Sequence, residues 1–264
     1  MTQANPDIQA ALREAVVEAG RLALKLAAEG YQTHLKAKGE PVTSVDLACD
    51  KLLRDRLGRA DGQAAWLSEE SQDDPARLTC PRVWLVDPVD GTRELLAGRG
   101  EWCICAALAQ WGQVQAGAIY NPNTQELFEA AAGQGATLNG QPVRVDPSPP
   151  PRPILVATRW RVEHGGWDWA GGLAEVRPCG STAYMLAQVG SGRADGMISL
   201  TQKNEWDMAA GALFIQEAGG TITDRNQAAL SFNRRRRRID GVIAARHGAR
   251  DAVVRIAERL KIEK

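Results

Sequence analysis

The chain lacks features that would place it in several large classes of protein. No apolar stretch approaches the roughly eighteen residues that a membrane span needs, and Met1–Asn5 does not show a basic-then-apolar signal pattern. The 32 basic and 32 acidic residues give a formal charge of zero, so no global attraction to nucleic acid or to anionic membranes is expected. These absences predict a cytoplasmic protein with no membrane partner.

Residues for zinc and redox chemistry are also few. The three histidines are scattered along the sequence, which disfavours a zinc site: His34, His164 and His247. The cysteines are odd in number and mostly lie in apolar contexts, which predicts reduced core thiols rather than disulfides: Cys49, Cys80, Cys103, Cys105 and Cys179. Strand alternation should point Cys103 and Cys105 to the same side.

What the chain does have is acidic residues beside predicted strand ends. In Asp87-Pro88-Val89-Asp90-Gly91-Thr92, two carboxylates lie on a predicted turn after the apolar run 83–86. That run predicts a buried strand, and open α/β sheets place their sites at the C-terminal ends of strands. The turn could offer a carbonyl oxygen to a hard cation and N–H groups to a phosphate. Alternatively, the two aspartates simply cap the helix that follows.

Three more acidic residues lie in contexts that could bring them to this turn. Asp46 opens an amphipathic helix whose N-cap is Thr43 or Ser44. Glu69 follows the short apolar run 64–68, another predicted strand. Asp207 begins the nearly all-apolar helix 208–215, where a carboxylate is costly unless it is paired or bound to metal.

The pattern of elements predicts two halves within one 264-residue unit. A first half, residues 1–146, opens with a helix over 7–29 and continues with an antiparallel meander of strands at 102–109, 114–120 and 126–131. The proline-rich stretch Asp146–Pro153 is the predicted linker. A second half, residues 153–264, alternates strand and helix at 154–158, 183–189, 196–200, 205–217 and 242–245.

Five motifs in order give a family resemblance. They are Pro41-Val42-Thr43-Ser44-Val45-Asp46, Leu67-Ser68-Glu69-Glu70-Ser71, Trp84 to Thr92, Gly180-Ser181-Thr182-Ala183, and Glu205 to Gly211 with Glu217-Ala218-Gly219-Gly220. Together they resemble the lithium-sensitive, magnesium-dependent phosphomonoesterase superfamily typified by inositol monophosphatase and the 3′(2′),5′-bisphosphate nucleotidases. The resemblance implies an α/β protein with the layered αβαβα sandwich of the inositol monophosphatase and fructose-1,6-bisphosphatase type, and it allows a homodimer.

The same resemblance implies a metal site for two or three Mg²⁺ ions. Glu69, Asp87 and the carbonyl of Val89 would hold one ion, and Asp87, Asp90 and Asp207 a second, with Asp87 bridging. A third, weaker ion would lean on Glu69. Independently of any resemblance, a donor set of carboxylate and carbonyl oxygens suits Mg²⁺.

Roles in catalysis and in substrate binding follow from the resemblance as well. Water would attack a phosphomonoester directly, and the hydrogen-bonded pair Thr92 and Asp46 would accept its proton, with Glu69 in the same catalytic group. The N–H groups of Gly91 and Thr92 would bind the phosphate oxygens. The residues expected to contact the rest of the substrate are Gly180, Ser181, Thr182 and Glu205.

The substrate is left open between nucleotides and polyols. Inositol monophosphatases place a hydroxyl-binding Glu seven residues before the Asp of the Trp-Asp pair, and here that position is Leu200. Gly91-Thr92-Arg93-Glu94 and Glu205-Trp206-Asp207 look more like the bisphosphate nucleotidases, although Leu95 replaces their usual Phe. We therefore favour 3′-phosphoadenosine 5′-phosphate over inositol phosphates and other sugar or polyol phosphates.

Arg234–Arg238 is the one local excess of charge. Five consecutive arginines could recruit RNA or an acidic partner, but no aromatic residues interleave them, which favours a solvated surface turn before the strand at Val242. One or two of the arginines could instead reach a second phosphate on the substrate. A rival interpretation is a non-catalytic, metal-dependent regulator or RNA-associated factor, which the intact metal and Thr92/Asp46 positions argue against.

Overall fold

The computed structural model describes residues 6–36 and 39–262. Met1–Asn5, where no signal pattern was expected, lie outside these ranges. Among the residues described, no helix combines the length and the apolar content that crossing a membrane would require.

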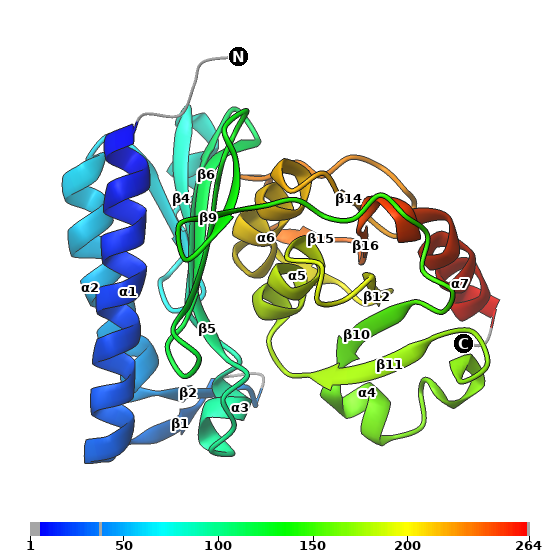
Figure 1. Cartoon of the computed structure of the whole chain (residues 1–264). Helices are drawn as coiled ribbons and strands as arrows, with labels where there is room; N and C mark the ends of the chain where they lie inside the picture. The colour runs from blue at the N-terminus through cyan, green and yellow to red at the C-terminus, as the bar shows by residue number, and fades with distance from the viewer. Residues whose placement is uncertain (1–5, 37–38, 263–264) are drawn as a thin grey trace.

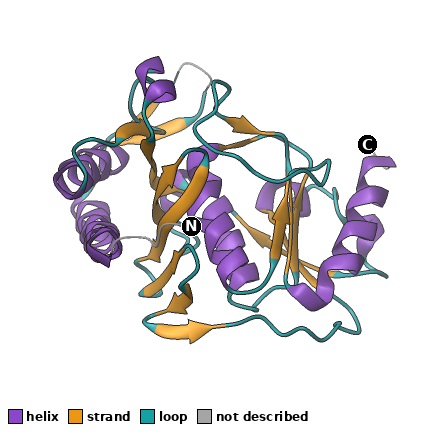
Figure 2. Ribbon diagram, turned by 90° about the horizontal axis from the view of Figure 1, so that it is seen from above, coloured by secondary structure: helices purple, strands orange, loops and turns teal. Residues whose placement is uncertain are grey.

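Helices and sheets alternate in five layers (Figure 1). Two helices, α1 and α2, cover one face of a seven-stranded sheet, and α5 and α6 lie between that sheet and a five-stranded one. The short α4 and the C-terminal α7 cover the outer face of the second sheet, and the view from above shows the same succession (Figure 2). The predicted αβαβα sandwich is confirmed. The helices are α1 (Pro6–Glu29), α2 (Ser44–Ala60), α3 (Thr92–Leu96), α4 (Arg159–Glu163), α5 (Thr182–Gly190), α6 (Glu205–Glu217) and α7 (Arg250–Ile262).

The seven-stranded sheet contains the predicted three-stranded meander, which further antiparallel strands extend on both sides and one parallel strand completes at an edge. Its strands lie in chain order, and all neighbours are antiparallel except the first pair. They are β3 (Ala65–Ser68), β4 (Arg82–Asp90), β5 (Cys103–Gln110), β6 (Gln113–Asn121), β7 (Glu126–Ala131), β8 (Gly135–Leu138) and β9 (Gln141–Val143).

The second sheet mixes parallel and antiparallel neighbours, and two short ribbons complete the fold. In spatial order the sheet is β11 (Glu175–Cys179), β10 (Ile154–Thr158), β12 (Gly196–Ser199), β16 (Val242–Ala245) and β14 (Thr221–Thr223). One ribbon joins β1 (Thr33–Leu35) to β2 (Pro41–Thr43), and the other joins β13 (Lys203–Asn204) to β15 (Arg238–Ile239). The helices and strands predicted beyond the linker are confirmed to within a residue or two.

Side-chain alternation distributes the core between the layers. Along β5, Cys103 and Cys105 pack toward α5 and α6, whereas Ile104 and Ala106 pack toward α1 and α2. The predicted common side of the two thiols is therefore confirmed, and all five cysteines are free. A separate apolar cluster, including Val253, lies under α7.

The two predicted halves share one of these clusters. Residues 146–153 join β9 to β10 without helix or strand, as the prolines predict. However, the cluster around α6 contains side chains from both sides of this linker, such as Leu85 and Phe214. The division into the halves 1–146 and 153–264 therefore remains a proposal, which describes the order of elements along the chain and not two separate cores.

The acidic motif lies on a strand, and not on a turn as expected. β4 continues through Asp87 to Asp90, paired with β5 on both sides of a bulge between these two residues. The bulge accommodates Pro88, which has no N–H to give to the ladder. The turn begins only at Gly91, whose φ of 104° is in the left-handed region. The bulge therefore lets two carboxylates emerge at the end of one strand.

Candidate active site

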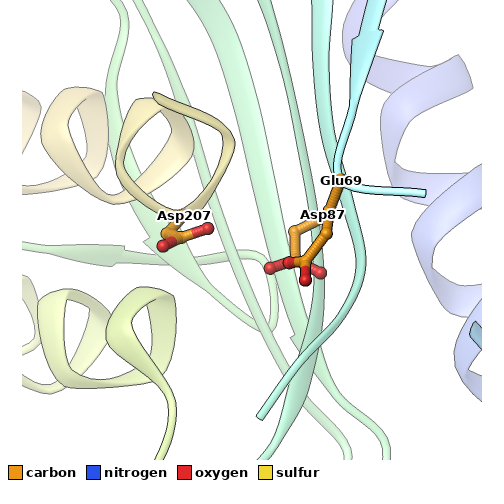
Figure 3. A group of neighbouring side chains, drawn as sticks. All are labelled: Glu69, Asp87 and Asp207. Carbon is orange, nitrogen blue, oxygen red and sulfur yellow. The ribbon is translucent and has the colours of Figure 1, made fainter. Parts of the chain in front are cut away.

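Three acidic side chains from three elements meet beside the seven-stranded sheet. β3 and β4 are parallel, with Ser68 opposite Val86, so Glu69 and Asp87 come next to each other at their C-terminal ends. Asp207 approaches from the first turn of α6, facing the other two (Figure 3). One carboxylate oxygen from each lies within 4.8 Å of the others. Sequence positions far apart thus form a single acidic cluster.

Burial makes this cluster electrostatically unfavourable by itself. Burial and the neighbouring acidic groups raise the pKa values of Asp87 and Asp207 well above the usual range, and burial raises the pKa of Asp90 to about 6. Within the described residues, the buried Oδ1 of Asp207 has no hydrogen-bond partner. A buried carboxylate oxygen without a donor is costly, so the site fits a cation held by oxygen ligands.

Asp90 is positioned by the start of α5. Its Oδ2 accepts hydrogen bonds from the Ser181 hydroxyl, at 2.8 Å, and from the Ala183 N–H. Ser181 is fully buried and is also the N-cap of α5, where its hydroxyl accepts from the Tyr184 N–H. Asp87 accepts instead from the Val89 N–H at 3.0 Å. Ser181, expected to contact the leaving group, thus serves to hold Asp90.

Asp46 and Thr92 form the hydrogen-bonded pair that the motifs predict. Thr43 is the N-cap of α2 and makes a capping box with Asp46, whose Oδ2 accepts from the Thr43 N–H at 2.9 Å. The other oxygen, Oδ1, accepts from the Thr92 hydroxyl at 2.8 Å. Because the capping box fixes the Asp46 side chain, Thr92 is held at the mouth of the acidic cluster.

A pocket opens over the acidic cluster and the start of α3. Its wall at Gly91 needs glycine, because φ is positive and an added Cβ would lie 3.0 Å from Trp102 Cβ. At Gly180 an added Cβ would lie 2.1 Å from Glu94, which is itself paired with Arg99 and Arg159. The pocket is lined by Glu40, Pro41, Glu69, Val89, Asp90, Gly91, Thr92, Arg93, Glu94, Thr158, Arg159, Trp160, Gly180 and Lys203.

Two residues of the substrate argument are placed differently from the expectation. Glu205 is fully buried, and its carboxylate accepts from the Asn233 and Arg234 N–H groups at 2.7 and 3.1 Å. A buried side chain with these partners does not face the pocket, so the structure does not place Glu205 among the substrate contacts. Leu200 is buried in the cluster beneath α7 and does not line this pocket. Thr182, also buried, accepts from Lys203 Nζ at 3.3 Å.

Several neighbours of the site gave no signal in the sequence. Lys36 Nζ lies 2.7 Å from both Glu69 and Glu70. Burial alone would lower the Lys36 pKa, but these two carboxylates raise it above the usual value. Trp206 Nε1 donates to Glu69 Oε2 at 3.3 Å. Each contact joins a loop or helix to a distant strand end, so no local pattern could have predicted it. The three histidines, by contrast, are exposed, as expected.

Comparisons with known proteins agree with this architecture. The model of the inositol monophosphatase family matches residues 5–261. An inositol-1-monophosphatase of Rhizobium meliloti is 33% identical over 74% of this chain and 76% of its own length. The Nus factor SuhB of Escherichia coli is 31% identical over 79% of this chain and 83% of its own length. A solved structure of the extragenic suppressor protein suhB from Bartonella henselae is 28% identical, with a TM-score of 0.82 over 96% of this chain and 98% of that one. The chain therefore belongs to the inositol monophosphatase family of phosphoric monoester hydrolases.

Proposed function

We propose that the chain is a Mg²⁺-dependent phosphatase in which water attacks a small phosphomonoester directly. The observation that carries this proposal is the cluster of Glu69, Asp87 and Asp207, in which one buried Asp207 oxygen has no hydrogen-bond partner among the residues that the structure describes. Two ions would be held by Glu69, Asp87, Asp90, Asp207 and the Val89 carbonyl, and a third, weaker one would lean on Glu69. When bound, Mg²⁺ supplies positive charge to the phosphate and lowers the pKa of coordinated water.

The pair Thr92 and Asp46 would take up the proton of the attacking water. The Thr92 hydroxyl already donates to Asp46 at 2.8 Å, so its oxygen can accept a proton while its own proton moves toward the carboxylate. The Thr43 N–H and hydroxyl both donate to Asp46 Oδ2 and hold Asp46 in place for this step. The N–H groups of Gly91 and Thr92, on the pocket wall, would bind the phosphate oxygens.

For the substrate we propose a 3′-phosphorylated nucleotide, with 3′-phosphoadenosine 5′-phosphate converted to AMP as the representative reaction. Trp160, on the pocket wall, is 64% exposed, and its ring stacks on His164 with centroids 4.7 Å apart and planes at 23°. His164 Nδ1 also lies 2.7 Å from the Trp160 carbonyl oxygen. One face of the indole is thus supported, which leaves the other for a planar base.

The second candidate substrate is inositol 1-phosphate. It is favoured by the Rhizobium meliloti relative, whose name is inositol-1-monophosphatase. The structure removes one argument against it, because Leu200 is buried and does not line the pocket. A polyol, however, has no planar ring to place on Trp160.

The test is phosphate release from both substrates by the wild type and by Trp160→Ala. The matched control is Trp111→Ala, because Trp111 is 75% exposed in the β5–β6 turn and does not line this pocket. Loss of base stacking should lower kcat/KM for the nucleotide roughly tenfold and leave inositol 1-phosphate within about twofold. Equal losses on both substrates would deny Trp160 a role in recognising a base. A wild-type preference of about tenfold for inositol 1-phosphate would overturn the nucleotide proposal.

A further inference from the structure

The arginine turn, defined as Asn233–Arg238, borders a second pocket next to the acidic cluster. This pocket contains five cationic side chains and two acidic ones. Glu40 and Glu69 line both this pocket and the one over Thr92, so one small ligand can extend from one to the other. The second pocket is lined by Lys36, Glu40, Glu69, Asn204, Trp206, Arg235, Arg236, Arg237 and Arg238.

Two buried charged residues fix the arginine turn from below. Glu205, fully buried, accepts from the N–H groups of Asn233 and Arg234. Arg77, 2% exposed, donates to Asn233 Oδ1 at 2.6 Å and to the Arg234 carbonyl at 3.0 Å. Burying these charges is costly unless they are paired and hydrogen-bonded. The turn is therefore more firmly held than a solvated surface run needs to be.

The same turn is tied to the helix that carries Asp207. Arg238 pairs with Asn204 where β15 meets β13, directly before α6. The Glu205 N–H donates to the Arg237 carbonyl at 3.1 Å. The arginine turn and the acidic cluster therefore have a fixed relative position, which is the requirement for gripping two groups of one ligand.

Three of the arginines are available to an anion. Arg237 lies 3.5 Å from Asp73 and over the Trp206 ring at 5.8 Å. The side chains of Arg235, Arg236 and Arg238 are exposed, and no ion pair or side-chain hydrogen bond within residues 6–36 and 39–262 engages them. Guanidinium groups match the geometry of phosphate oxygens and bind them in a bidentate manner.

We propose that the arginine turn binds a second phosphate group of the substrate, while the acidic cluster acts on the first. This inference rests on the proposed phosphatase function and specifies its substrate class as a small molecule with two phosphate groups. A macromolecular anion fits less well, because the arginines line a pocket that continues into the catalytic one. Arg93, which lies next to Thr92 in the sequence, lines the pocket over the acidic cluster and not the one at the arginine turn.

The test compares substrates that differ only in the second phosphate. We would measure kcat/KM for 3′-phosphoadenosine 5′-phosphate and for 3′-AMP with the wild type and with Arg235→Ala/Arg236→Ala. The control is Arg250→Ala/Arg255→Ala, which removes the same charge from exposed positions of α7. Inositol 1,4-bisphosphate and inositol 1-phosphate provide the same comparison on a polyol, so the two sources of a second phosphate are distinguished.

We expect the wild type to prefer the nucleotide with two phosphates by about tenfold or more, as charge-assisted bidentate contacts allow. The variant Arg235→Ala/Arg236→Ala should lose this preference, keeping its activity on 3′-AMP within about twofold, whereas the α7 control should keep the preference. An unchanged preference in the arginine-turn variant would overturn the proposal. Loss of binding to a single-stranded RNA probe, with the substrate preference intact, would also overturn it in favour of a macromolecular site.

Calorimetry separates this proposal from the phosphatase function itself. Binding of 3′-phosphoadenosine 5′-phosphate and of 3′-AMP is measured with Ca²⁺ in place of Mg²⁺. If no monoester is hydrolysed at all, the proposed function fails. Even then, weaker binding of only the ligand with two phosphates by Arg235→Ala/Arg236→Ala would support the anion site, and equal binding by wild type and variant would refute it.

Discussion

The acidic cluster and the arginine turn each concentrate charge of one sign, but they tolerate it by opposite means. Glu69, Asp87 and Asp207 lie together, and burial raises the pKa values of the Asp87 and Asp207 carboxylates. Over residues 6–36 and 39–262, one Asp207 oxygen has no hydrogen-bond partner. The arginine turn keeps every arginine but Arg237 exposed, while Glu205 and Arg77 hold its backbone. Buried like charges need a counter-ion to be stable, whereas exposed ones are solvated. Burial is therefore consistent with the resident ion proposed for the first region, and exposure with the exchangeable ligand proposed for the second.

The largest expected effect comes from removing charge in the buried region. Asp87→Asn should lower turnover by about three orders of magnitude, because both proposed ions lose a ligand. Calorimetry should show Mg²⁺ binding lost in parallel. Asp55→Asn is the control, since Asp55 is an exposed carboxylate on α2 whose partners are the surface arginines Arg56 and Arg59. Near-normal Mg²⁺ binding and turnover in Asp87→Asn would contradict the proposal that the acidic cluster, unlike the arginine turn, holds a resident ion.

A smaller effect should follow from Thr92→Ala, which sharpens the comparison by leaving the charge of the cluster intact. Without the hydroxyl that donates to Asp46, uptake of the proton from water should slow by about 10²-fold. Mg²⁺ affinity, measured by calorimetry, should stay close to that of the wild type. If Thr92→Ala lost Mg²⁺ as completely as Asp87→Asn, the roles assigned to these residues would be wrong.

The smallest of the three effects on kcat/KM for a substrate with one phosphate should come from Arg235→Ala/Arg236→Ala.

Local sequence patterns predicted those parts of the molecule whose contacts follow from regular elements. The alternation along β5 fixed the side of Cys103 and Cys105, and adjacent parallel strand ends bring Glu69 to Asp87. The pairing of Asp46 with Thr92 was implied by the family resemblance and not by a local pattern, and the capping box of α2 explains how the pair is held. These features depend on strand and helix geometry, which recurs wherever the pattern does.

Features that depend on long-range packing were not predictable in this way. Glu205 was expected to contact substrate because it precedes Trp206 and Asp207. Instead, its two carboxylate oxygens accept hydrogen bonds from the Asn233 and Arg234 N–H groups. Its partners come from a turn that no helix or strand pattern places beside α6. Likewise, β4 extends to Asp90 because β5 continues to pair with it across the bulge, which the local sequence Asp87-Pro88 did not suggest.

The most direct test of the phosphatase account is phosphate release from 3′-phosphoadenosine 5′-phosphate during removal and return of metal. One preparation is assayed with Mg²⁺, then with excess chelator, and then with Mg²⁺ restored. The account predicts that activity disappears in chelator and returns with Mg²⁺, because the proposed ions at the cluster of Glu69, Asp87 and Asp207 supply the positive charge for the phosphate and lower the pKa of the attacking water. Full activity in chelator would contradict it.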